Sequence, residues 1–263
     1  MTAHSSATLD TAEVDRFNAL ASEWWDPTGK FRPLHKLGPA RLGFIRDACF
    51  SHFPDLNQQN RKPLAGLTLL DVGCGGGLIA EPLARLGATV TAIDPAAQTI
   101  AAAQHHADQQ HLNVNYRATQ VESLVEADEM FDVVTCLEVV EHVPDVEAFL
   151  RACTSLVSPG GLFVGATINR TLKSYALAIV AAEYILGWLP RGTHRWDRFI
   201  QPKEFSAHLK RQELQVAKIE GIVHNPLADS WSRSSDTDVN YMIAAAKPPS
   251  PPIQADNQAH APS

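Results

Sequence analysis

The chain has 263 residues, of which 45% are hydrophobic and 19% are charged, and its formal net charge is −7 at pH 7. This length suits one large domain with a substantial core, and the acidic balance argues against nucleic acid as a partner. The four cysteines show neither zinc spacing nor a C-x-x-C pair, and the N-terminus lacks a signal-peptide pattern, so a reduced, cytoplasmic location is expected.

The N-terminal part of the chain predicts two helices in front of the main domain. Residues 1–10 are small and polar and are expected to form a loose tail. A helix is predicted over Asp10–Trp25, because Asp10 can cap it and apolar residues then recur on one helical face. A second helix is predicted over Pro39–Phe50.

From Leu67 onward, short apolar runs alternate with helical segments. This alternation predicts an α/β domain over residues 11–247, with a mostly parallel sheet and helices on both faces. An insertion is expected at about 168–200, and residues 248–263 are expected to be a disordered tail. The predicted strands are Leu67–Val72, Thr89–Ile93, Phe131–Leu137, Leu162–Ala166, Val216–Ile222 and Tyr241–Ala246, and the predicted helices are Ile79–Leu86, Thr99–Gln109, Val146–Leu156 and Pro202–Arg211.

The most informative stretch is Leu69–Gly77, where a strand runs into a glycine-rich turn that opens a helix. Glycines let the backbone turn tightly and approach a ligand. Asp94 ends the next strand, about 20 residues on, where a carboxylate can accept hydrogen bonds from ribose hydroxyls. A dinucleotide site is the main rival, but its third glycine is replaced by Leu78. Asp71 would also repel a pyrophosphate, whereas it suits a cationic amino-acid group.

The glycine-rich stretch resembles motif I of the class I S-adenosylmethionine-dependent methyltransferases, through Asp71, Gly73, Gly75 and Gly77. This resemblance implies a Rossmann-like fold with a seven-stranded sheet, an N-terminal helical cap and an inserted apolar segment. It also suggests a contact between Glu122 and the adenine region, although a surface carboxylate is nearly as good an interpretation.

Segments outside this motif are similar to the ubiquinone-biosynthesis O-methyltransferase family, from about Val14 to Lys247. The resemblance implies that S-adenosylmethionine donates a methyl group to a phenolic hydroxyl of a polyprenylated catechol, 2-polyprenyl-6-hydroxyphenol, and of demethylubiquinol. Other ubiquinone-biosynthesis proteins are further partners that it suggests. The segments are Trp24-Trp25-Asp26, Phe31-x-Pro33-Leu34-His35, Arg41–Ile45, Glu138-x-x-Glu141-His142-Val143-Pro144, Ala182–Leu186, Arg191–His194 and Asp238–Met242.

The resemblance implies that Arg41, Gly73, Asp94 and Leu137 correspond to the residues that contact the cofactor in this family. Arg41 would bind the methionine carboxylate through charge-assisted hydrogen bonds, and Leu137 would act through its backbone. Without the resemblance, Arg41 would be interpreted as a surface helix arginine. The predicted cofactor site is completed by Asp71, Gly75 and Glu122.

Glu138, Glu141 and His142 are the candidate catalytic residues, because a neutral phenol, with a reference pKa of about 10, must lose its proton. In a helix, their spacing would place all three on one face. They could then hold a divalent cation such as Mg²⁺, which would lower the pKa of the catechol oxygens. His142 as a general base without metal is the second interpretation. Solvated glutamates, with His142 capping a turn, are the third.

The run Tyr175–Leu189 is almost entirely apolar, yet at about 15 residues it is too short to span a bilayer. Residues 170–198 carry five basic and two acidic side chains in an otherwise acidic chain. Such a segment is typical of contact with an anionic membrane surface, here on the inner face of the membrane. A core helix or a lid over the substrate is an equal alternative from the residues alone, and a lipid-dissolved substrate favours the membrane.

Two other classes of protein stay open. One is a soluble O-methyltransferase that acts on another small phenolic or carboxylic substrate. The other is a non-catalytic cofactor-binding subunit. The inserted segment and the Glu138, Glu141 and His142 group argue against the first, and the intact glycine motif argues against the second.

Overall fold

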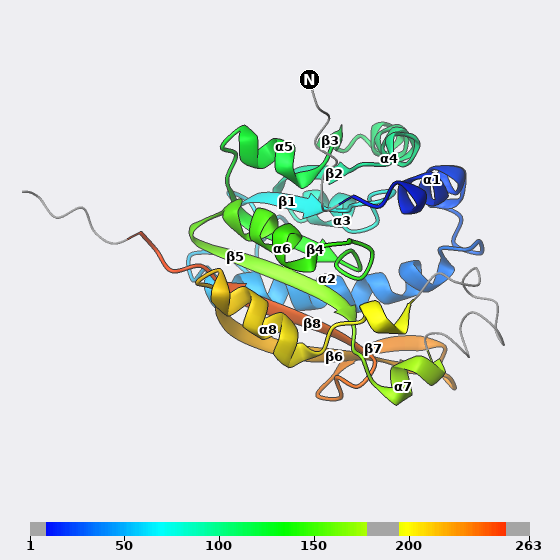
Figure 1. The fold of residues 1–263 in the computed structure, drawn as a ribbon. Coiled ribbons are helices and arrows are strands. Elements are labelled where there is room, and N and C mark those ends of the chain that lie inside the picture. The colour runs from blue at the N-terminus through cyan, green and yellow to red at the C-terminus, as the bar shows by residue number, and fades with distance from the viewer. Residues whose placement is uncertain (1–8, 178–194, 251–263) are drawn as a thin grey trace, which may run out of the picture.

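The computed structural model describes residues 9–177 and 195–250. Eight strands form one sheet in the order β3-β2-β1-β4-β5-β8-β6-β7, with helices on both faces (Figure 1). Strands β1 to β5 pair in parallel, whereas β8, β6 and β7 pair antiparallel. The strands are β1 Thr68–Val72, β2 Thr89–Asp94, β3 Val114–Ala118, β4 Phe131–Leu137, β5 Val157–Ile168, β6 Gln215–Asn225, β7 Ser230–Ser234 and β8 Asn240–Ala246.

Two hydrophobic clusters, one on each face of the sheet, hold the helices in place. Leu69 and Val133 belong to the first cluster, whereas their neighbours Leu70 and Val134 belong to the second. Because both faces are covered, β1 and β4 contain consecutive apolar residues, such as Leu69–Leu70 and Val133–Val134, rather than a strict alternation. The first cluster packs against α2 Arg32–His52, α3 Ala80–Arg85 and α4 Ala97–Gln109, and the second against α5 Val121–Glu126, α6 Val146–Ser155 and α8 Pro202–Arg211.

The α/β class and the helices on both faces confirm the prediction from the sequence, but the predicted count of seven strands is wrong. The eighth strand, β7, reads Ser-Trp-Ser-Arg-Ser and has no apolar run that would indicate a strand. It forms because the hairpin pairs Gly221 with Ser234 and Asn225 with Ser230. Strand β3, at the edge of the sheet, was also missed, although its sequence Val-Asn-Tyr-Arg-Ala alternates apolar and polar residues as a half-buried strand does.

The predicted N-terminal helix is two shorter pieces. Helix α1 covers Thr11–Ala19, and the backbone N–H of Ala12 donates to the Asp10 carboxylate at 3.2 Å. A single 3₁₀ turn, η1, follows at Ala21–Glu23. Helix α1 lies beside α4, outside the sheet (Figure 1). The second predicted helix starts earlier than expected, at Arg32: Pro33 lies in its first turn, where a proline is tolerated, and Pro39, the predicted start, lies inside the helix.

The expectations for the two tails and for the insertion fall largely on residues 1–8, 178–194 and 251–263, which lie outside the described residues. The described ends of the insertion contain α7, Leu172–Ser174, and the 3₁₀ turn η3, Trp196–Arg198. Within residues 9–177 and 195–250, no helix combines the length and apolar character that crossing a membrane requires.

Candidate active site and cofactor site

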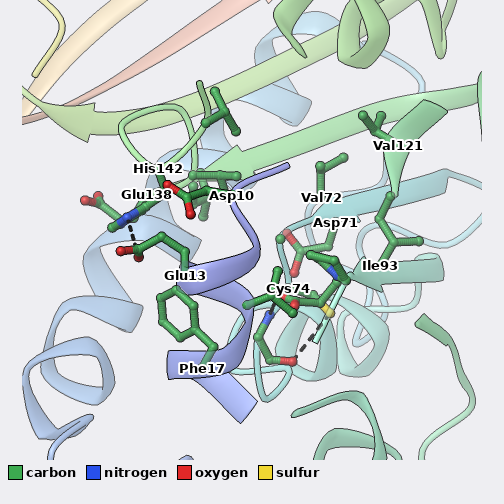
Figure 2. Close-up of a pocket in the computed structure, with 18 of the residues that line it drawn as sticks. Asp10, Glu13, Phe17, Asp71, Val72, Cys74, Ile93, Val121, Glu138 and His142 are labelled. Atoms are coloured by element: carbon green, nitrogen blue, oxygen red, sulfur yellow. Dashed lines mark hydrogen bonds and ion pairs between the residues drawn. The ribbon is translucent and has the colours of Figure 1, made fainter. Parts of the chain in front are cut away.

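A cavity of about 260 Å³ lies where β1, β2 and β4 end, and α1 covers one side of it. Ligands of open α/β sheets bind at this edge, outside the carboxyl ends of parallel strands. Figure 2 shows Glu13 of α1 in contact with His142, and Asp71 beside the glycine loop. Every site residue predicted from the sequence lines this cavity: Arg41, Asp71, Gly73, Gly75, Asp94, Glu122, Leu137, Glu138, Glu141 and His142.

The glycine loop after β1 depends on backbone conformations that favour glycine. Gly73 and Gly75 have φ angles of 70° and 51°, in the left-handed region. A Cβ atom on Gly73 would come within 2.4 Å of Val139 Cγ2, so the loop and the segment after β4 are closely packed. The loop backbone can therefore approach a ligand in the cavity without a side chain between them.

Asp94, at the end of β2, is fixed by two backbone donors. The N–H of Gly75 donates to one carboxylate oxygen at 3.1 Å, and the N–H of Ala96 donates to the other at 2.9 Å. Burial raises the pKa of Asp94, and these two hydrogen bonds oppose the rise. The carboxylate is thus oriented toward the cavity with lone pairs left to accept from two vicinal hydroxyls.

Asp71 and Arg41 are the buried charged groups of the cofactor half of the cavity, at 3% and 5% exposure. Thr135 Oγ1 donates to one oxygen of Asp71 at 2.7 Å, while the other oxygen has no hydrogen-bond partner among the described residues. Burial raises the pKa of Asp71 to about 7. Arg41 pairs with Glu138 at 2.7 Å, but its Nε has no partner within the described part of the chain. The cavity thus has an acceptor, Asp71 Oδ2, and a donor, Arg41 Nε, without partners among the described residues. These two groups complement the ammonium and the carboxylate of an amino acid.

The acceptor half of the cavity departs from the predicted geometry. Residues 138–144 form a non-helical turn, and Glu138 itself has φ at 55°, so the helical face on which the metal prediction depended does not exist. Glu138 pairs with Arg41, Glu141 accepts a hydrogen bond from Thr167 at 2.9 Å, and His142 contacts Glu13. In the described ranges, no group of three His, Cys, Asp or Glu side chains is placed to hold a metal ion. The side chains of Glu138, Glu141 and His142 therefore have separate protein partners instead of sharing one helical face.

His142 and Glu13 form the ion pair that faces the acceptor half of the cavity. Their Nδ1 and Oε2 atoms are 3.1 Å apart (Figure 2). Burial lowers the pKa of His142, but the contact with Glu13 and the charge of Glu141 outweigh it, so the pKa is raised. Burial and the charge of Glu138 raise the pKa of Glu141 to about 7.

The sequence did not assign a role at the site to Glu13 or Phe17, both on α1. Both residues fall within the predicted N-terminal helix, Asp10–Trp25. The ring of Phe17 meets the His142 ring edge-on, with the centroids 6.0 Å apart. The helical spacing of Glu13 and Phe17 was the one available signal, because it puts both on the same face of α1.

Comparisons with known proteins agree with this geometry. Residues 70–165 match a family model described as a methyltransferase domain. A magnesium protoporphyrin IX methyltransferase from Synechocystis, solved with bound SAH, has a TM-score of 0.64 at 18% identity and covers 90% of this chain and 99% of its own. This likeness shows the fold, and with the glycine loop it defines a class I S-adenosylmethionine-dependent methyltransferase.

Two curated relatives give the family. A ubiquinone biosynthesis O-methyltransferase from Rhodopseudomonas palustris is 53% identical over 241 residues, covering 92% of this chain and 94% of the relative. Another from Brucella anthropi is 52% identical over 248 residues, covering 94% and 100%. The chain belongs to the ubiquinone biosynthesis O-methyltransferase family. The predicted enzyme class and cofactor, S-adenosylmethionine, are confirmed.

Proposed function

We propose that this enzyme methylates a phenolic hydroxyl of a polyprenylated catechol, 2-polyprenyl-6-hydroxyphenol, and of demethylubiquinol. The names of the relatives support this substrate class. The observation that carries the proposal is the His142–Glu13 pair, which lies beside apolar side chains in the acceptor half of the cavity. An aromatic ring fits such surroundings, and one polar pair can act on its hydroxyl. The apolar lining consists of Val14, Phe17, Leu20, Val143 and Phe149.

The cofactor half of the cavity would hold S-adenosylmethionine in one orientation. Its amino-acid end would lie between Asp71 and Arg41, which supply the unmatched acceptor and donor. Asp94 would accept from the ribose hydroxyls. The backbones of Gly73, Gly75 and Leu137 and the side chain of Glu122 would complete the contacts. When bound, the sulfonium supplies an activated methyl group to an oxygen held in line with it.

His142 is the general base of this proposal. With the hydrogen of His142 on Nδ1, which lies 3.1 Å from the Glu13 carboxylate, the lone pair of Nε2 is available to accept the phenolic proton. The Glu13 carboxylate stabilises the imidazolium that forms, and the raised pKa of His142 narrows the gap to the pKa of a phenol. The proton then stays on His142 until solvent removes it.

A divalent cation at Glu138, Glu141 and His142 is the second candidate for activating the phenol. The mutual repulsion of Glu138 and Glu141, which contributes to the raised pKa of Glu141, favours it, because a cation would relieve this repulsion. The separate partners of the three side chains count against it. No step of the proposed reaction depends on the cation, and a chelator tests for it directly.

Contact of residues 170–198 with an anionic membrane surface, peripheral on its inner face, stays part of the proposal. The described start of this segment exposes Leu172, Tyr175 and Leu177, which are 83%, 48% and 50% exposed. The predicted core of the segment, Tyr175–Leu189, lies mostly outside the described residues. A lid over the substrate is the alternative. Other ubiquinone-biosynthesis proteins are further partners that the family resemblance leads us to expect.

A turnover assay with a short-chain catechol tests the proposed function. We expect equal amounts of O-methylated product and S-adenosylhomocysteine, and no turnover of a matched control in which both hydroxyls are already methylated. The assay is run with and without a chelator. Absence of product from an enzyme that binds the cofactor would overturn the proposed substrate class. Loss of turnover on chelation alone would transfer the activating role to a cation.

A further inference from the structure

Several buried polar atoms that line the cavity have no hydrogen-bond partner among the described residues; Glu13 Oε2 and Glu141 Oε1 belong to the acceptor half, and three others belong to the cofactor half. These three are Trp24 Nε1, Arg41 Nε and Asp71 Oδ2. Two are donors and one is a carboxylate oxygen. Buried polar groups in folded proteins nearly always have partners, so these three atoms of the cofactor half indicate a ligand with the complementary groups.

The Trp24 ring is held against the glycine loop. A Cβ atom on Gly75 would come within 2.3 Å of the ring, and one on Gly76 within 2.5 Å of the Trp24 side chain. On another side, the ring stacks on Phe31 with centroids 3.9 Å apart and planes 8° apart. The indole is only 6% exposed. Its position is therefore fixed beside the part of the loop that faces the cofactor half of the cavity.

The neighbouring Trp25 shows how an indole is satisfied in the same segment. Its Nε1 donates to the carbonyl of Gly76 at 2.9 Å, and its ring stacks on His106 with centroids 3.5 Å apart. Trp24 and Trp25 thus contact the same loop, but of the two only Trp25 has an acceptor for its N–H among the described residues. A buried indole N–H normally has such an acceptor, and a ligand bound in the cavity can supply the one that the described residues do not.

We infer that Trp24 is a further cofactor-binding residue, and that its indole N–H donates to the carboxylate of the methionine moiety beside Arg41. One carboxylate can accept from both donors, while the ammonium group of the same moiety pairs with Asp71. The three unmatched atoms are then matched by a single zwitterion. The inference rests on the proposed placement of the amino-acid end at Arg41 and Asp71.

The test compares two ligands on the full-length enzyme by calorimetry. S-adenosylhomocysteine carries the amino-acid end, and 5′-methylthioadenosine lacks it. We expect Trp24→Phe to weaken S-adenosylhomocysteine binding about 10-fold or more, the effect of losing a hydrogen bond to a charged group. Binding of 5′-methylthioadenosine should be unchanged, which also shows that the pocket is folded. The control Trp25→Phe should change the binding of the two ligands by the same factor.

Equal effects of Trp24→Phe on both ligands, or no effect on either, would overturn the inference. If this variant fails to fold, a benzothienylalanine at position 24 replaces only the N–H by sulfur and is held to the same expectation. Arg41→Met separates the inference from its premise, because it too should weaken only S-adenosylhomocysteine. If Arg41→Met behaves so and Trp24→Phe does not, only the role of Trp24 is wrong. If neither is selective, the placement of the amino-acid end is wrong as well.

Discussion

Replacing Asp71 by asparagine should make the cofactor-free protein more stable and a poorer cofactor binder. Asp71 is 3% exposed, and burial raises its pKa from 3.8 to about 7. Because the folded-state pKa lies above the unfolded-state value, the folded protein holds this proton more tightly than the unfolded chain does. The stability that this carboxyl contributes is therefore complete at acidic pH and is lost as the pH rises toward 7.

The magnitude follows from the two pKa values and from the hydrogen bonds. The difference between 3.8 and about 7 corresponds to about 4 kcal/mol lost at pH values above 7. Asparagine carries no charge, and its amide oxygen can still accept from Thr135. Its amide NH₂, however, takes the place of Oδ2, an atom without a partner among the described residues. That buried donor costs about 1–3 kcal/mol. We expect Asp71→Asn to gain roughly 1–3 kcal/mol of unfolding free energy at about pH 8, and nearly nothing at about pH 5.

Urea unfolding of the cofactor-free wild type and variant at the two pH values measures the gain. Calorimetry with S-adenosylmethionine measures the loss of binding, which we expect to be about 10-fold or more because the ammonium group loses its carboxylate. Thr135→Val serves as a control, since it removes the donor to Asp71 but keeps the charge. A wild type that is more stable than Asp71→Asn at the higher pH, or unchanged cofactor affinity, would refute the reasoning.

Four further predictions concern other parts of the site. Asp94→Asn should weaken S-adenosylmethionine about 10-fold or more in calorimetry, because the ribose loses a charged acceptor; unchanged affinity would contradict its assignment. His142→Gln should abolish catechol turnover while S-adenosylhomocysteine binds normally, and retained turnover would exclude it as the base. A chelator, and separately Glu138→Gln, should each leave the single-turnover rate of methyl transfer within about 10-fold of that of the untreated wild type. Loss of turnover in both experiments would favour the bound cation. Finally, the protein should co-sediment with anionic liposomes, less at high salt, and a variant with aspartate at Leu186 and Trp188 should not.

The sheet and the cofactor half of the site could be predicted from the sequence because their signals are local. Apolar runs such as Phe131–Leu137 became strands with the predicted bounds. The glycine loop is a continuous stretch whose unusual φ angles only glycine adopts easily. Asp71 is the next-to-last residue of β1 and Asp94 is the last residue of β2. These two strands are parallel neighbours, so their carboxyl ends lie at the same edge of the sheet. Their meeting in one cavity therefore followed from topology alone.

The acceptor half could not be predicted in the same way. The spacing of Glu138, Glu141 and His142 suits a helix, but the left-handed conformation of Glu138 and the turn after it separate their side chains. Nothing in the local sequence around His142 indicates Glu13, because this contact depends on how α1 docks. The position of α1 depends on all of its packing contacts with the rest of the domain, including that of the Phe17 ring with His142.

The site is built from two parts of the chain with different origins in the fold. The sheet and its glycine loop supply Asp71 and Asp94, and they lie within residues 70–165, the part that matches the general methyltransferase domain. The segment before the sheet supplies Glu13 to His142 and Trp24 to the glycine loop. The helices of this segment, α1 and η1, form no part of the sheet and pack against α4. Because this segment contributes side chains to both halves of the cavity, we expect the choice of acceptor to depend on it more than on the glycine loop.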